Sequence, residues 1–168
     1  MSTSFELPSP DDFLPAAVGP PGERVFYVQA REGDQVVTLR LEKAQVSALA
    51  EHISGMLRDL PPTTAEQSAT ELTEPVIAEW VVGSMGVAYD EERDRIILVA
   101  EELVDEDNPD PDSGSARIAL SRELAVGFVE RAREVVSAGR PLCQVCGLPK
   151  DPEGHICPRS NGHRRDEA

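Results

Sequence analysis

The chain has 168 residues, with 31 Asp and Glu against 16 Lys and Arg, so its formal net charge is −15. Residues 140–168 carry five basic and four acidic side chains, which leaves 11 basic against 27 acidic in residues 1–139. A body this acidic repels nucleic-acid phosphates and anionic lipid headgroups, so we expect neither nucleic acid nor a membrane as a partner.

Residues 1–22 are rich in Pro, Ser and Gly, and we expect a flexible N-terminal segment there. The first residues lack the basic and apolar regions of a secretion signal. No stretch approaches the roughly 18 apolar residues of a membrane span. Three cysteines grouped as ligands also suit a reducing compartment, so the sequence predicts a cytoplasmic protein.

Residues 23–139 are expected to form an α+β domain that begins with a hairpin. Two β-branched and alternating stretches, 25–30 and 35–41, are separated by a Gly-containing turn at 32–34. Apolar residues then recur at helical spacing, which predicts a helix from residue 42 to the Pro61-Pro62 pair. The polar, proline-bounded residues 61–74 are expected to form a surface linker.

The second half begins with a long strand over residues 76–89, with a bulge expected at Gly83 or Gly86. The elements expected after it are a strand at 95–100, an acidic loop at 101–114, a short strand at 116–120 and a helix that Ser121 caps and that ends near residue 138.

The two halves are alike where a strand leads into a helix. Residues 39–43 parallel residues 118–122, and each half has an earlier strand that ends in alanine. The pattern predicts an α+β fold in which one antiparallel sheet carries two helices on one face. A duplicated strand–strand–helix unit would explain the parallel, and coincidental patterning is the alternative.

The tail, residues 140–168, contains all three cysteines of the chain. Cys143 and Cys146 are three positions apart, so one tight turn brings both sulfurs to one ion. His155 and Cys157 are two positions apart, so in extended chain both side chains point to one face. Three thiolates and one imidazole form the ligand set of a structural zinc site. The sequence therefore predicts a zinc knuckle with ligands Cys143, Cys146, His155 and Cys157.

Several alternatives to this zinc site remain open. His163 could replace His155 as the fourth ligand, and a catalytic zinc would have one of the four positions free. Cys143 and Cys146 could instead form a dithiol redox pair, the cysteines could form a structural disulfide, or they could have no role in a disordered tail.

Two acidic clusters outside the tail could also carry chemistry. The loop at 101–114 offers closely spaced aspartates to calcium, but the required glycine and terminal glutamate are out of register, so we expect a solvated loop. Residues 89–94, Tyr-Asp-Glu-Glu-Arg-Asp, combine acids with a cation and could act on a phosphorylated small molecule. Their position between two apolar strands favours a charged hairpin turn.

Three stretches resemble an uncharacterised actinobacterial family, the domain of unknown function 3090. They are residues 25–31, residues 86–94 and the tail pattern Cys-x-x-Cys-Gly-x-Pro with Asp-Pro-x-Gly-His-x-Cys-Pro-Arg-x-Asn-Gly over residues 143–162. The resemblance implies the same four ligands, Cys143, Cys146, His155 and Cys157, and it implies no activity.

The sequence contains no nucleophile elbow, phosphate-binding loop or dinucleotide fingerprint. We therefore expect a non-enzymatic cytoplasmic interaction or regulatory module with a structural zinc site and an unidentified protein partner. The alternative function is an enzyme that acts on a phosphorylated small molecule.

Overall fold

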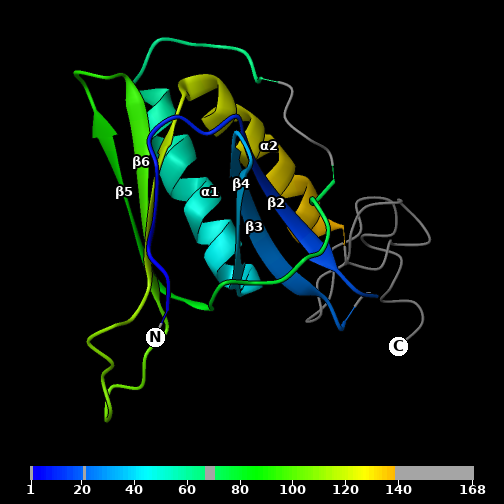
Figure 1. The fold of residues 1–168 in the computed structure, drawn as a ribbon. Helices are drawn as coiled ribbons and strands as arrows, with labels where there is room; N and C mark the ends of the chain where they lie inside the picture. The colour runs from blue at the N-terminus through cyan, green and yellow to red at the C-terminus, as the bar shows by residue number, and fades with distance from the viewer. Residues whose placement is uncertain (1, 21, 67–70, 139–168) are drawn as a thin grey trace, which may run out of the picture.

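The strands of the domain divide between two sheets (Figure 1). The computed structural model describes residues 2–20, 22–66 and 71–138. The three-stranded sheet is antiparallel, in the order β2 (Asp12–Val18), β3 (Val25–Glu32) and β4 (Gln35–Leu41). The four-stranded sheet has the order β1 (Phe5–Leu7), β7 (Ser115–Leu120), β6 (Arg95–Glu102) and β5 (Val82–Asp90), and β1 is parallel to β7. The α+β class is confirmed, but the single antiparallel sheet that we expected is wrong.

Two helices complete the fold, α1 (Lys43–Arg58) and α2 (Arg122–Ser137). At the start of α1 the backbone N–H of Glu42 donates to the Gln45 side-chain oxygen at 2.7 Å. At the start of α2 the Ser121 hydroxyl accepts from the Leu124 N–H at 3.1 Å, which confirms the predicted cap. The apolar positions at helical spacing are the buried ones, Val46, Leu49, Ala50 and Ile53 in α1 and Leu124, Ala125, Phe128, Val129, Ala132 and Val135 in α2.

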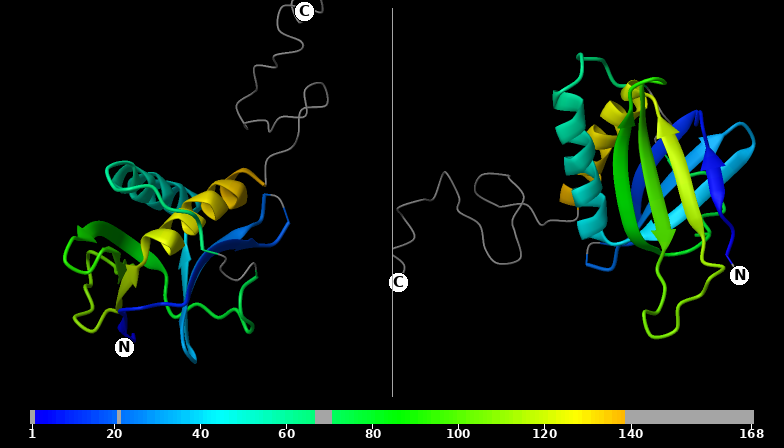
Figure 2. Two further views of the ribbon diagram at one scale, coloured as in Figure 1. Left: turned by 90° about the horizontal axis from the view of Figure 1, so that it is seen from above. Right: turned by 90° about the vertical axis from the view of Figure 1, so that its left-hand side faces the viewer.

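Each helix packs against a strand of the other half of the chain. α2 contacts β2 more extensively than it contacts β6 and β7, the strands that immediately precede it. α1 contacts β5. The two helices also pack against each other, and Figure 2 shows both on the same side of the two sheets. The rings of Phe13 in β2 and Phe128 in α2 are stacked with centroids 4.7 Å apart. One continuous core therefore joins both halves.

Two strands lie in the N-terminal segment, where the sequence predicted mainly flexible chain. The apolar residues Leu7, Phe13 and Leu14 of β1 and β2 are buried. Pro15 obscured the β2 pattern, but β2 is an edge strand, where proline is tolerated because one side of the strand needs no ladder hydrogen bonds.

β5 contains the predicted bulge at Gly83, but it begins at Val82, six residues later than expected. A side chain at Gly83 would place its Cβ 2.8 Å from the Leu103 Cα, so the close approach requires glycine. Residues 79–81 border β4 in parallel instead of extending β5. The Glu79 N–H donates to the Thr38 carbonyl at 2.8 Å, and the Arg40 N–H donates to the Trp80 carbonyl at 3.2 Å.

The contact between α2 and β2 can be tested with Phe128→Ala. Phe128 is fully buried, so the loss of its ring should lower the free energy of unfolding by about 3–5 kcal/mol. Urea denaturation would measure this change. Val18→Ala is the control. Val18 also lies in β2 but is 47% exposed, so this substitution should change the free energy of unfolding by no more than about 0.5 kcal/mol. A loss under about 1 kcal/mol for Phe128→Ala would contradict the described core.

Candidate functional site

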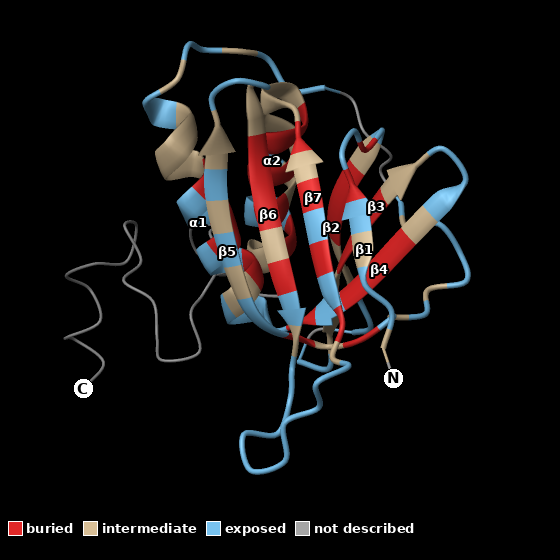
Figure 3. Ribbon diagram, turned by 60° about the vertical axis from the view of Figure 1, so that its left-hand side comes forward, coloured by how far each residue is buried: buried red, intermediate tan, exposed pale blue. Residues whose placement is uncertain are grey.

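The four-stranded sheet has one face that neither α1 nor α2 covers (Figure 3). Alternate residues of its strands, such as Ile96, Leu98 and Ile118, belong to the core on the helix side. The residues between them point the other way, and we call this outward surface the open face. Its members are Glu6 of β1, Ser84, Gly86, Ala88 and Asp90 of β5, Arg95, Ile97, Val99 and Glu101 of β6, and Ser115, Arg117 and Ala119 of β7.

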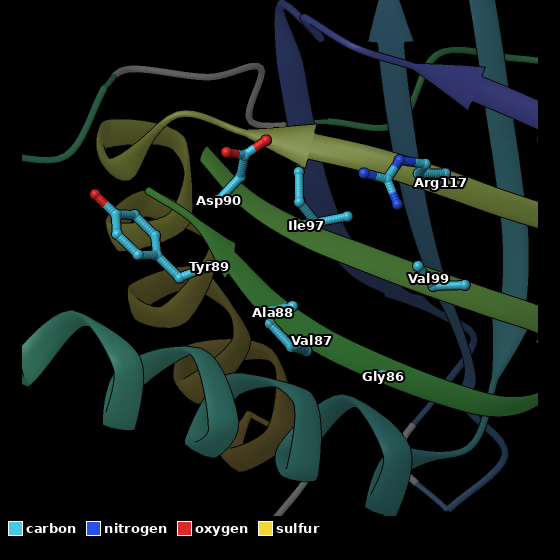
Figure 4. Close-up of a pocket in the computed structure, with 8 residues that line it drawn as sticks. All are labelled: Gly86, Val87, Ala88, Tyr89, Asp90, Ile97, Val99 and Arg117. Atoms are coloured by element: carbon cyan, nitrogen blue, oxygen red, sulfur yellow. The ribbon is translucent and has the colours of Figure 1, made fainter. Parts of the chain in front are cut away.

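A shallow hollow of about 420 Å³ lies on the open face (Figure 4). Its floor is low because Gly86 and Ala88 of β5 contribute almost no side chain. The branched residues Ile97 and Val99 give the floor an apolar character. The lining residues are Gly86, Val87, Ala88, Tyr89, Asp90, Ile97, Val99 and Arg117. Two adjoining hollows of about 470 and 330 Å³ also include Arg117, so this arginine lies where the three meet.

Arg117 is an exposed cation at the centre of the open face. Its side chain makes no hydrogen bond or ion pair with any residue that the structure describes. On the neighbouring strands it is opposite Glu6 and Val99. A guanidinium has five N–H donors in a planar fork that fits a carboxylate. The hollow thus combines an apolar floor with a cation that is available to a ligand.

The predicted cluster at residues 89–94 forms a different arrangement beside the hollow. The Tyr89 hydroxyl donates to the Asp94 carboxylate at 2.7 Å, and the Arg122 Nε donates to the same carboxylate at 3.1 Å. Arg122 also donates from Nη1 to the Pro61 carbonyl at 2.8 Å. These contacts tie the β5–β6 turn to the start of α2 and to the linker after α1. We call Tyr89, Asp94 and Arg122 the turn latch.

The contacts of the turn latch favour an ionised Asp94 and a protonated Tyr89. The hydrogen bond from Tyr89, together with Arg122, lowers the pKa of Asp94 below its usual value. The hydrogen bond to Asp94 raises the pKa of Tyr89 above its usual value. A general acid or base works best with a pKa near the operating pH, and both shifts move away from neutrality.

Other shifted groups in the described ranges follow the same pattern. The hydrogen bond and charge of Asp12 raise the pKa of Arg31. The Gly114 N–H and the Ser2 hydroxyl lower the pKa of Glu102, which closes the acidic loop. The backbone N–H of Glu123 and the Thr63 hydroxyl lower the pKa of Glu123. Each shift favours the charged form that the group already has at neutral pH, which suits a structural contact better than proton transfer.

The predicted zinc ligands Cys143, Cys146, His155 and Cys157, and the alternative His163, lie outside the described residues. Within residues 2–20, 22–66 and 71–138, no group of three or more His, Cys, Asp or Glu side chains could hold a metal ion. Two aspartates of the acidic loop, Asp105 and Asp110, accept hydrogen bonds from backbone N–H groups two residues later. None of the helices in this part of the chain is long and apolar enough to cross a membrane.

Sequence reasoning missed Arg117. The alternation of apolar and other residues over 116–120 places it opposite the buried side of the strand, so its outward direction could have been found. The alternation does not reveal whether the outward face is covered. That depends on segments distant in the sequence.

Residues 5–157 match the model of a protein family described as "Protein of unknown function (DUF3090)". The match covers both sheets and both helices, and it ends at Cys157. No curated protein and no solved structure matches the chain.

The turn latch can be tested with Asp94→Asn. Because the folded state lowers the Asp94 pKa, its stabilising contribution is present above the unfolded aspartate pKa of about 3.9 and is lost as the pH falls through the folded-state value. The variant should be less stable at pH 7 and should lose less stability on acidification below about pH 4. Urea denaturation at a series of pH values would measure both effects.

Asp34→Asn in the β3–β4 turn is the matched control for this variant, because Asp34 is exposed and makes no side-chain contact with a described residue. If the free energy of unfolding of Asp94→Asn followed the same pH dependence as that of the unchanged protein, the turn latch would carry no ionised aspartate.

Proposed function

The chain belongs to the DUF3090 family of proteins of unknown function, and we propose that it is a cytoplasmic, non-enzymatic interaction module that binds through the open face. The observation that carries this proposal is Arg117, an exposed cation that makes no side-chain contact with a described residue and lies over an apolar floor. In an otherwise acidic chain, an exposed arginine beside an apolar hollow offers a binding surface for a negatively charged group.

The proposed ligand is an extended segment of a partner protein. The hollow is shallow and meets two further hollows at Arg117, so together they suit an extended chain better than a compact metabolite. Ile97 and Val99 would contact an apolar side chain of the partner, and Arg117 would bind a carboxylate beside it. The negative charge of the surrounding body disfavours nucleic acid and anionic lipid.

The tail contributes the second part of the proposal, a structural zinc knuckle with ligands Cys143, Cys146, His155 and Cys157. The ligand spacing supports it, and so does the family match, which extends through the last of the four residues. Four protein ligands would leave no open position for substrate, so the metal would organise the tail.

The enzyme alternative depended on the cluster at residues 89–94. In the structure, Tyr89 and Asp94 bind each other and Arg122, and their shifted pKa values favour static roles. These contacts favour the binding module over an enzyme that acts on a phosphorylated small molecule.

The binding surface can be tested with a photo-reactive benzophenone amino acid in place of Ala88, which lines the hollow. Irradiation of cells followed by mass spectrometry should identify one dominant partner segment with an acidic residue near the attachment point. Arg117→Glu should reduce this cross-link at least about tenfold, because a central arginine commonly dominates the energy of an interface.

Arg40→Glu makes the same charge change at an exposed position of β4 and should leave the cross-link unchanged. Equal cross-linking in both arginine variants would eliminate the open face as the binding surface.

The zinc knuckle can be tested by elemental mass spectrometry of purified full-length protein. We expect one equivalent of zinc, lost in Cys146→Ser and in His155→Ala because each removes a ligand. His163→Ala should retain the metal. Zinc that survives in His155→Ala but not in His163→Ala would assign the fourth ligand to His163, and protein without zinc would refute the site.

A further inference from the structure

The two halves of the domain share one topology. Each half has a three-stranded antiparallel meander, β2-β3-β4 or β5-β6-β7, that is followed by a 16-residue helix. The last strand of each meander has a parallel neighbour, which is residues 79–81 beside β4 and β1 beside β7. The helices also bury equivalent positions. Val46, Leu49, Ala50 and Ile53 of α1 each have a buried counterpart 79 positions later, at Ala125, Phe128, Val129 and Ala132.

In the first half, the chain covers the outward face of its own sheet. Gln29 of β3 and Thr38 of β4 are opposite each other on that face, yet they are only 5% and 3% exposed. The Gln29 side chain accepts from the Thr73 N–H at 2.7 Å and donates to the Thr73 carbonyl at 3.1 Å. It also donates to the Thr38 hydroxyl at 2.9 Å. The segment around Thr73 therefore lies over the centre of the three-stranded sheet.

The corresponding place in the second half is the open face. The counterpart of Thr38, 79 positions later, is Arg117, and the residue opposite Arg117 is Val99, as Gln29 is opposite Thr38. Arg117 is exposed and Val99 is only half-buried. Among the described residues, the outward face is thus covered at this position in the first half and uncovered in the second.

The covering segment in the first half is the chain that follows α1. It leaves α1 at Arg58 and passes the start of α2, where Thr63 donates to Glu123 at 2.9 Å and the Pro61 carbonyl accepts from Arg122. It reaches Gln29 at Thr73, 15 residues after Arg58. Figure 1 shows the first part of this chain leaving the end of α1 at the top of the molecule.

The chain that follows α2 is long enough for the same course. α2 ends at Ser137, and 31 residues follow it in the sequence. The position 15 residues after Ser137 is Pro152, which Asp151 and Glu153 flank. Two carboxylates would thus lie where the open face offers the guanidinium of Arg117. These residues are between the two predicted pairs of zinc ligands, so a knuckle could present them as a loop.

We propose that the C-terminal segment of this chain docks on the open face, with Asp151 or Glu153 bound to Arg117. The docked segment completes the second half as the segment around Thr73 completes the first. The regulatory consequence rests on the proposed function, because the segment then occupies the surface that a partner would use, and a partner must displace it.

The test uses purified full-length protein with the benzophenone residue in place of Ala88 and no other protein present. Irradiation should give an intramolecular cross-link from position 88 to residues 148–156, identified by mass spectrometry. The same residue in place of Asp34, in the β3–β4 turn of the other sheet, should give no such cross-link. A cross-link from position 88 only to a second copy, or none to the tail, would overturn the proposal.

Charge reversal makes the test specific. Arg117→Glu should reduce the intramolecular cross-link about fivefold, since an exposed ion pair contributes up to about 1 kcal/mol. Combining it with Asp151→Lys and Glu153→Lys should restore the cross-link, and failure of this restoration would refute the pairing. A tail cross-link without a cellular partner would refute only the proposed function, and a partner without a tail cross-link would refute only this inference.

Discussion

The apolar layer between the helix pair and the two sheets is the constraint on which the rest of the structure depends. Each helix packs against a strand of the other half, and Phe13 and Phe128 stack at the centre of one of these contacts. Neither half can bury its apolar residues without the other, because the core is continuous across both sheets. The domain should therefore fold as one cooperative unit.

This packing determines which surfaces are available for function. Both helices lie on one side of the sheets, so the outward face of each sheet must be covered by irregular chain or remain exposed. The linker after α1 covers the three-stranded sheet through Gln29 and Thr73, and the four-stranded sheet is left with the hollow around Arg117. The difference between two similar halves is therefore the basis of the proposed binding surface.

Part of the candidate site could be predicted from the sequence. The turn at residues 89–94 was located correctly, and within it Tyr89 contacts Asp94 and Arg93 contacts Asp90. Their third partner, Arg122, is 28 residues from Asp94, and no local pattern connects the two. The open face was not predicted for the same reason, since its exposure depends on where the linker crosses and on the pairing of β1 with β7.

The sequence by itself determined the elements that local physics controls. The two helices, the β3–β4 hairpin, the β6 and β7 strands, the cap at Ser121 and the bulge at Gly83 all follow from side-chain periodicity or from the backbone preferences of single residues. The cysteine and histidine spacing predicts a zinc ligand set in the tail, which lies outside the described residues and stays a prediction. Only the tertiary structure decided that the strands form two sheets, that each helix packs on the other half and that no described segment covers the outward face of the four-stranded sheet. Those outcomes depend on contacts between residues far apart in the chain, whose combined burial outweighs any local preference.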